Sequence, residues 1–283
     1  MIPERYHGLP VKAFRFGRWR LGLLYSQARQ RLEYWDFRLT EGRRLRKLKN
    51  IHAGERCFII GNGPSIRQHD LAKLRNEIVF VVNDFFMHED YSKINPNYHC
   101  LCDVNFYRNG ALDTYRCQML TDRTRDAVKF MSVYLKPIVE GSKLFLNHSI
   151  YYLYHRGRKV WELDRINMDI TKELYIGDTL VVDYCLPLAF YMGCSTVYLI
   201  GCDCDYQVDK AADFSKGYFY DTRLVSNEGR QSVDYLTHKW FDHVTRSHSI
   251  AKQCFEAEGR AIYNAGIGGT LEVYERVNYD NLF

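Results

Sequence analysis

The stretch RCFIIGNGPS, from Arg56 to Ser65, constrains the fold of this chain more than any other. Its apolar run, Cys57 to Ile60, has the length and β-branched character of a buried strand. The run stops at two glycines that flank Asn62, and a helical pattern follows from Ile66 to Leu74. This order of strand, turn and helix predicts a doubly wound α/β sheet, whose ligands bind at the carboxyl ends of the strands. Glycines let a backbone approach a phosphate closely, so we expect the turn to form the nucleotide end of an active site.

Two further apolar runs are predicted to be strands, Ile78 to Val82 and Tyr98 to Cys102. Each leads to a polar side chain, Asn83 in the first case and Asp103 in the second. Because parallel strands end at one edge of a sheet, these side chains are expected to share a site with the glycine turn.

The strongest strand pattern in the chain, Thr196 to Ile200, is followed by a similar polar turn at 201–206. Before it we expect a buried helix from Leu180 to Tyr191, ended by Gly193. A helix near 249–258 and a short strand over 261–264 follow, whereas the sequence does not order residues 105–176 into the sheet.

Residues 204–245 form a polar and aromatic stretch directly after a strand end. A long irregular insertion in that position is a candidate active-site lid. We therefore expect one catalytic domain over residues 51–283 with a lid at about 204–245. The nine cysteines are expected to be reduced in a cytoplasmic protein, because the first residues contain no signal-peptide core. No apolar run is long enough to predict a membrane-spanning helix.

The first 50 residues differ in charge from the rest of the chain. They carry 13 Lys/Arg against 4 Asp/Glu, whereas the other 233 residues carry 26 against 30. Residues 11–48 also mix aromatic and leucine side chains with arginines, as an interfacial amphipathic helix does. This segment is expected to bind the inner face of the cytoplasmic membrane, or else to pack on the catalytic domain or a second subunit.

Two acidic and cysteine motifs have more than one interpretation. Asp203 and Asp205 resemble a carboxylate pair that holds Mg²⁺ or Mn²⁺, but one aspartate could instead cap a turn. The pairs Cys100/Cys102 and Cys202/Cys204 lack the usual C-x₂-C spacing of zinc sites, so cysteines in or after strands are favoured. The glycine turn also lacks the lysine of a P-loop, and a purely structural turn is its alternative.

Three histidines lie near the start of the last predicted helix, namely His238, His243 and His248. Histidine is the commonest general base, although a single histidine can equally be structural. Two tyrosines of the predicted lid, Tyr206 and Tyr218, can donate hydrogen bonds to a departing phosphate, and packing is their alternative role.

The order of these motifs resembles glycosyltransferase family 42, the bacterial lipooligosaccharide sialyltransferases. The resemblance rests on the Gly61–Ser65 turn, Asn83, Thr179, the run from Val197 to Asp203 and a late histidine. The chain is also similar to a broader group described as 6-hydroxymethylpterin diphosphokinase-like. The likeness covers about residues 51–264, and it implies a Rossmann-like, mostly parallel sheet with a lid insertion.

The resemblance also implies roles for individual residues. His243 is the implied general base, with His248 as the alternative, while Tyr206 and Tyr218 would hydrogen-bond the leaving phosphate. The implied donor-nucleotide site consists of Asn62, Gly63, Pro64, Ser65, Asn83, Asp103, Thr179, Gly201, Cys202 and Asp203.

The implied reaction is transfer of a nonulosonic acid of the sialic acid type from a CMP-sugar to a hydroxyl of a bacterial surface glycan. It inverts the anomeric centre and needs no metal or other cofactor, and self-association is common in the family. One alternative is a pterin diphosphokinase in which Asp203 and Asp205 hold Mg²⁺–ATP. A second is a non-catalytic module that binds a nucleotide or a nucleic acid through the basic segment, although nucleic acid is the less expected partner.

Overall fold

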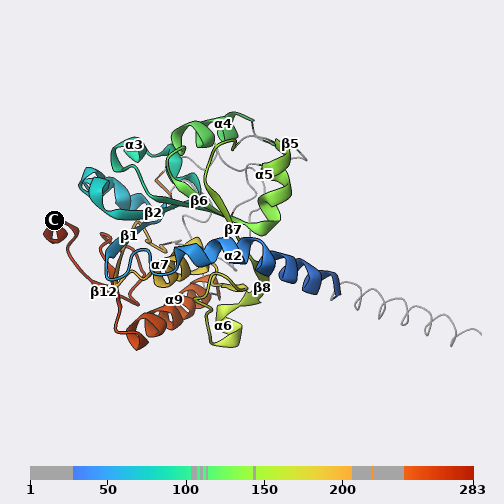
Figure 1. Cartoon of the computed structure of the whole chain (residues 1–283). Helices are drawn as coiled ribbons and strands as arrows, with labels where there is room; N and C mark the ends of the chain where they lie inside the picture. The colour runs from blue at the N-terminus through green and yellow to red at the C-terminus, as the bar shows by residue number, and fades with distance from the viewer. Residues whose placement is uncertain are drawn as a thin grey trace, which may run out of the picture.

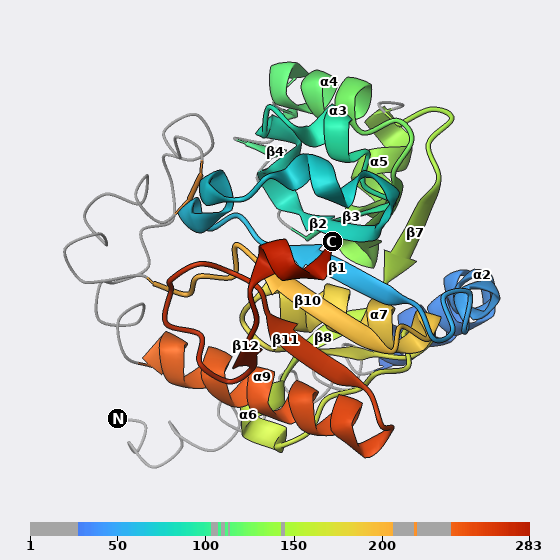
Figure 2. The ribbon, with the colours of Figure 1, turned by 90° about the vertical axis from the view of Figure 1, so that its left-hand side faces the viewer.

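A parallel sheet forms the centre of the computed structural model, which describes residues 28–102, 107–108, 111–112, 114–142, 145–205, 218–219 and 239–283. The sheet has eight strands in the order β12-β11-β10-β1-β2-β3-β6-β7, and its neighbouring strands all pair in parallel. Helices cover both faces (Figures 1 and 2), which confirms the predicted doubly wound α/β fold. The strands are β1 (Arg56–Ile60), β2 (Ile78–Val82), β3 (Tyr98–Leu101), β6 (Val128–Ser132), β7 (Ile150–Leu153), β10 (Thr196–Ile200), β11 (Ala261–Asn264) and β12 (Glu275–Arg276).

Two small sheets accompany the main one, an antiparallel pair and a parallel pair. The first consists of β4 (Tyr107–Arg108) and β5 (Ala111–Leu112), and the second of β8 (His155–Lys159) and β9 (Leu174–Ile176). Residues 28–39 are helical. The other α-helices are α2 (Glu41–Leu45), α3 (Tyr91–Ile94), α4 (Thr114–Arg123), α5 (Lys136–Ser142), α6 (Val160–Leu163), α7 (Leu186–Met192) and α9 (Trp240–Ala257).

The order of the strands reverses beside β1. The chain moves outward from β1 through β2, β3, β6 and β7, and then returns to the opposite side of β1 as β10. The register pairs Arg56 with Thr196 and Ile60 with Ile200, so the two strands end at the same level. Ligands of doubly wound sheets bind at such a reversal, beyond the carboxyl ends of the strands.

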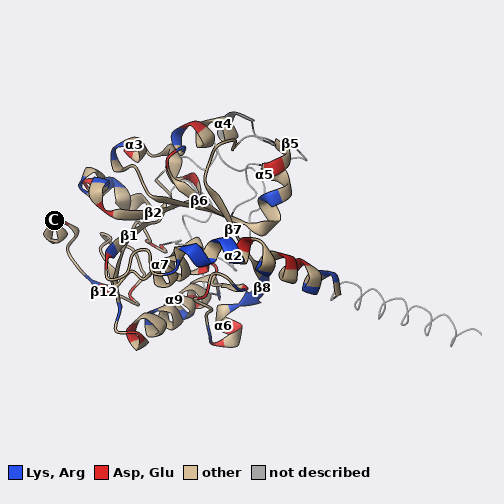
Figure 3. Ribbon diagram, in the orientation of Figure 1, with Lys and Arg blue, Asp and Glu red and all other residues tan. Residues whose placement is uncertain are grey.

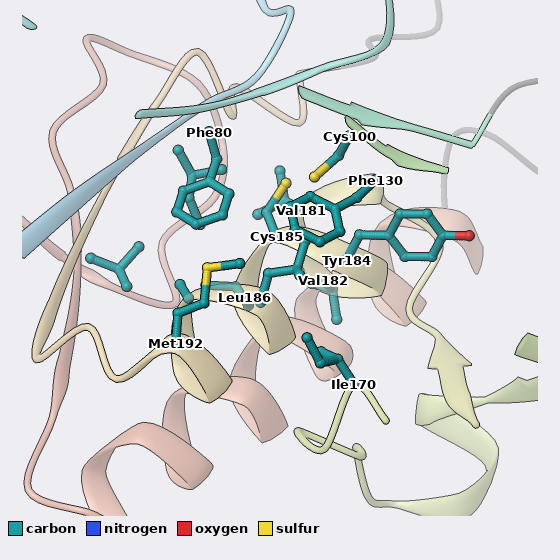
Figure 4. Close-up of a cluster of buried hydrophobic side chains, with 14 of the residues drawn as sticks. Phe80, Cys100, Phe130, Ile170, Val181, Val182, Tyr184, Cys185, Leu186 and Met192 are labelled. Atoms are coloured by element: carbon teal, nitrogen blue, oxygen red, sulfur yellow. The ribbon is translucent and has the colours of Figure 1, made fainter. Parts of the chain in front are cut away.

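The core has one hydrophobic cluster on each face of the sheet. Alternating residues of β1 divide between them, so that Cys57 and Ile59 join one cluster while Phe58 and Ile60 join the other. Helices α7 and α9 cover the first cluster, which contains Cys57 and Ile59. Helices α3 and α4 cover the second cluster, which contains Phe58 and Ile60 (Figure 2). Figure 4 shows the first cluster, where the chain from Val181 to Met192 contributes side chains that pack toward Phe80 and Phe130.

The helix expected from Ile66 to Leu74 is absent, and that prediction is wrong. Two 3₁₀ helices replace it, η2 (Pro64–Gln68) and η3 (Leu71–Asn76). The chain becomes extended at His69, between them, and the Asp70 carboxylate then caps η3 by accepting a hydrogen bond from the Ala72 N–H. The turn at Asn62 therefore leads into a 3₁₀ turn rather than into the positive end of a long helix.

The buried helix expected from Leu180 to Tyr191 is present, but its first turn is wider than predicted. A π-helical turn, η7 (Val181–Cys185), precedes α7, and Gly193 ends α7 with φ of +94° as predicted. The helix expected at 249–258 begins earlier than predicted, since α9 runs from Trp240 to Ala257.

All nine cysteines are free thiols.

The helix over residues 28–39 packs part of its surface on the body that contains the sheet. Phe37 is buried, and the rings of Tyr34 and Phe37 lie 5.3 and 5.2 Å from the ring of Tyr154. Within the described ranges, no helix is both long and apolar enough to cross a bilayer.

Candidate active site

The two turns that follow β1 and β10 are joined by one carboxylate. Both oxygens of Asp203 accept hydrogen bonds from Ser65, one from its backbone N–H at 2.9 Å and one from its hydroxyl. The Gly63 N–H also donates to the Gly201 carbonyl at 2.8 Å. The predicted nucleotide residues of the two turns, Cys202 among them, thus lie side by side at the reversal of strand order.

Close packing explains the glycines of these turns. A Cβ atom on Gly61 would lie 2.3 Å from the Gly201 carbonyl oxygen, and one on Gly63 would lie 2.4 Å from a carboxylate oxygen of Asp203. Gly201 itself has φ of +63°, and a Cβ there would meet Ile66 at 2.2 Å. Any larger residue would push the turns apart, so the glycines set the shape of the site.

Asn62 connects these turns to the end of β2. Its side-chain N–H donates to the Val82 carbonyl at 3.2 Å, directly before Asn83. The side-chain oxygen of Asn62 is buried and accepts no hydrogen bond from the residues that the structure describes. Asn83 has φ of +42°, its carbonyl accepts from His99, and its side-chain oxygen accepts from the Cys102 N–H at 3.4 Å. Strained backbone of this kind often accompanies functional sites.

Tyr218 lies next to a residue that is anchored on the glycine turn. The Phe219 N–H donates to the Asn62 carbonyl at 3.0 Å, and Arg67 donates to the Phe219 carbonyl. The Phe219 ring is buried against Phe85 and His88. This short piece of the predicted lid therefore lies against the turn.

His243 lies in the first half of α9 and belongs to a second group of polar residues. Its ring stacks on Trp161, with the ring centres 4.3 Å apart and an interplanar angle of 10°. Its Nδ1 atom lies 3.5 Å from a carboxylate oxygen of Asp178, and the side chain is 29% exposed. An imidazole held by a ring and a carboxylate, yet open to solvent, can accept a proton from a substrate hydroxyl.

His248 differs from His243 in being fully enclosed. Its Nδ1 atom lies 2.9 Å from the Tyr274 hydroxyl, and its Nε2 atom lies 3.4 Å from the hydroxyl of Thr179. Burial lowers the pKa of His248 to about 3, so this ring is neutral across the physiological range. These contacts favour a structural role for His248, and they place Thr179 beside α9.

Asp183 is a further polar residue of this second group. Its carboxylate accepts a hydrogen bond from the Gly177 N–H in the loop that carries Asp178. Removal from solvent, reinforced by the negative charge of Asp178, raises the pKa of Asp183 to about 8. Perturbed carboxyl groups of this kind gather at functional sites.

Several predicted residues lie outside the described residues, namely Asp103, Tyr206 and His238. The same holds for most of the predicted lid. Pro64 is described and begins η2, where it contributes no N–H donor. Within the described ranges, no group of three or more His, Cys, Asp or Glu side chains is placed to hold a metal ion.

Sequence reasoning missed three residues of the second group, Trp161, Asp178 and Asp183. Asp178 follows Tyr175-Ile176-Gly177, a short apolar run that ends in a glycine, and this pattern could have indicated a polar residue at a strand end. Asp183 stands inside an otherwise apolar helix, so its polarity there was a second signal. Nothing local to Trp161 indicates its contact with His243, which is 82 residues away.

A profile of the family described as "6-hydroxymethylpterin diphosphokinase MptE-like" matches residues 37–209. The chain belongs to this MptE-like family. The match covers more than half of the chain and includes both turns of the candidate site, and it confirms the predicted resemblance to the diphosphokinase-like group. A comparison with curated protein sequences finds no significant match.

Two solved structures resemble this MptE-like chain. The sialyltransferase CstII from Campylobacter jejuni, in complex with the substrate analogue CMP-3FNeuAc, is 15% identical, with a TM-score of 0.46 over 79% of this chain and 86% of CstII. The monofunctional α-2,3-sialyltransferase Cst-I from the same organism is 16% identical, with a TM-score of 0.49 over 80% of this chain and 81% of Cst-I. At these identities the likeness concerns the fold and carries no statement about activity.

Proposed function

We propose that this chain is a transferase that moves a group from a nucleotide-activated donor to a hydroxyl. The observation that carries the proposal is the pair of hydrogen bonds from Ser65 to Asp203, which joins two glycine turns at the reversal of strand order. The buried side-chain oxygen of Asn62 points to a ligand there, because it accepts no hydrogen bond from the described residues. A hydroxyl or amino group of a nucleoside would satisfy it.

His243 is the proposed general base. It would take the proton of the acceptor hydroxyl while the freed oxygen bonds to the electrophilic atom of the donor, whose bond to the leaving phosphate breaks. Asp178 would hold the imidazole in orientation and stabilise its protonated form, and Trp161 would fix the plane of the ring. General-base catalysis of this type contributes about 10²–10⁴-fold to the rate.

For the donor we propose a CMP-activated nonulosonic acid and a glycan acceptor, and this choice rests on the motif order in the sequence. The electrophilic atom is then the anomeric carbon, and CMP leaves with the electron pair of the broken C–O bond. Tyr218 is the proposed donor of a hydrogen bond to the departing phosphate, because its neighbour Phe219 is tied to Asn62. No metal is needed in this scheme.

The family match favours a second candidate, a diphosphokinase that transfers from ATP to a pterin hydroxyl. Such an enzyme would use Mg²⁺, and Asp203 and Asp205 are the carboxylates after β10. Both oxygens of Asp203 already accept hydrogen bonds from Ser65, so this pair does not fit a magnesium site well. His243 could serve as base in either reaction.

One assay separates the two candidates. The purified chain is incubated with CMP-sialic acid and a glycan acceptor and, separately, with ATP and a hydroxymethylpterin. Each mixture contains Mg²⁺ or EDTA, and release of CMP or AMP is measured. CMP release that persists in EDTA and falls in His243→Gln supports the CMP-sugar transferase. Magnesium-dependent AMP release with no CMP release would contradict it in favour of the diphosphokinase, and inactivity with both donors would contradict both.

A further inference from the structure

A basic cavity lies at the amino ends of the strands, whereas the candidate active site lies at their carboxyl ends. The cavity has a volume of about 740 Å³, and its walls come from segments that precede β1, β9, β10 and β11. Its charged lining residues are Arg38, Arg46, Lys49, Lys172, Arg260 and Asp169. Five of these side chains are cationic and one is a carboxylate, so the cavity favours a multiply charged anion.

The positive charge of the cavity is only partly compensated. Asp169 is paired with Lys172 at 2.9 Å. Arg260 donates to the Phe190 carbonyl at 2.6 Å and lies over the Phe190 ring, which fixes the guanidinium in the wall. Arg46 and Lys49 are exposed, and within the described ranges no ion pair neutralises them. These two residues therefore supply unneutralised charge at the mouth of the cavity.

The helix over residues 28–39 carries an exposed apolar stripe next to this cavity. Leu32, Trp35 and Leu39 recur at three- and four-residue spacing, which places them on one side of the helix, and they are 70%, 64% and 56% exposed. Arg38, on the flank of the same helix, lines the cavity. Figure 3 shows basic residues on this helix and on α2, which follows it.

We propose that this end of the molecule docks on an anionic lipid surface. The apolar stripe would enter the boundary between headgroups and acyl chains, and the cavity would take a phosphate headgroup. Charge complementarity selects this occupant over a protein partner, because apolar side chains beside several basic residues match a surface that is apolar beneath and negative above. The inference is independent of the catalytic proposal.

The test is co-sedimentation of the full chain with vesicles of phosphatidylcholine alone or mixed with phosphatidylglycerol. The wild type should bind the mixed vesicles only. The charge reversal Arg46→Glu/Lys49→Glu and the stripe variant Trp35→Ser/Leu39→Ser should each lower binding by about tenfold or more. The control reversal Arg75→Glu/Arg125→Glu changes the net charge equally at exposed positions elsewhere, and it should bind much as the wild type does.

Each other result overturns the proposal. Equal binding to neutral vesicles would remove the role of charge, and undiminished binding by both variants would assign binding to another part of the chain. An equal loss in the control reversal would show an effect of net charge alone. If inorganic phosphate at fixed ionic strength raises the melting temperature of the wild type but not of Arg46→Glu/Lys49→Glu, and vesicles do not bind, the cavity takes a soluble anion instead. All variants change exposed side chains, and unaltered melting curves confirm that they fold.

Discussion

Ser65 donates two hydrogen bonds to Asp203, one to each carboxylate oxygen, across 138 residues of sequence. This link joins the first turn of the sheet to the turn on the other side of the strand-order reversal. It helps to set the shape of the site, and it makes Asp203 a positioning residue for both turns.

The first prediction concerns this link. Asp203→Asn keeps the size of the side chain, but one Ser65 donor loses its acceptor and the other keeps only an uncharged amide oxygen. The free energy of unfolding should fall by about 1.5–3 kcal/mol, as measured by urea denaturation. Asp280→Asn is the control, because its carboxylate is 72% exposed and pairs with Lys73 at the surface. A loss there above about 1 kcal/mol, or no loss at Asp203, would contradict this account.

A second prediction compares two glycines. Gly63→Ala would place a Cβ atom 2.4 Å from Asp203, so the turns must separate, and both stability and nucleotide affinity should fall. Gly141→Ala, in α5, meets nothing within 4 Å and should stabilise the protein by about 0.5–1 kcal/mol. Calorimetric melting and nucleotide titration measure both effects. Nucleotide binding by Gly63→Ala at wild-type strength would remove the turn from the site.

The third prediction separates the two histidines of α9. His243→Gln should lower kcat by about 10²–10⁴-fold with little change in the melting temperature. His248→Gln should instead lower the melting temperature, because it disturbs the buried contacts with Tyr274 and Thr179. Asp178→Asn should lower kcat less than His243→Gln does. If His248→Gln is stable and His243→Gln remains active, the assignment of the base is wrong.

A fourth prediction follows from two buried histidines. Burial lowers the pKa of His99 and of His248 to about 3, whereas an unfolded histidine titrates near 6.5. Between these values the unfolded chain binds more protons than the folded one, so acid favours unfolding. Above pH 6.5 these two histidines should not lower the free energy of unfolding. Below pH 6.5 each should lower it by about 1.4 kcal/mol for every pH unit.

Urea denaturation from pH 7 to pH 4 measures this slope. Carboxylates add their own acid sensitivity, so the informative comparison is the difference between wild type and His248→Gln at each pH. That difference should shrink as the pH falls, because the variant lacks one group that resists protonation. A difference that stays constant with pH would show that His248 is not neutral in the fold.

The sequence identified most of the sheet because its central strands are short apolar runs with polar ends. The strands over 78–82, 196–200 and 261–264 have the predicted bounds. β6 was missed because Lys129 interrupts the apolar pattern of Val128–Ser132. In the structure Lys129 is fully buried and its ammonium donates to the nearby carbonyls of Thr124 and Ala127, an arrangement that hydrophobic periodicity does not reveal.

The candidate site, like the sheet, could be predicted from the sequence only in part. The two glycine turns were recognisable because the packing of Gly61 and Gly63 requires glycine in the sequence itself. The group around His243 was only partly recognisable, since Trp161 approaches it from α6 and Asp178 approaches it from the loop after β9. Contacts made by distant segments leave no local pattern, so these partners emerged only from the fold.

The most direct test of the account is a crystal structure of the chain with CMP. The account predicts the nucleotide against the two joined turns, Gly61–Ser65 and Gly201–Asp205, with a hydrogen bond to the side-chain oxygen of Asn62. Density for CMP anywhere else, including the basic cavity at the amino ends of the strands, would contradict it.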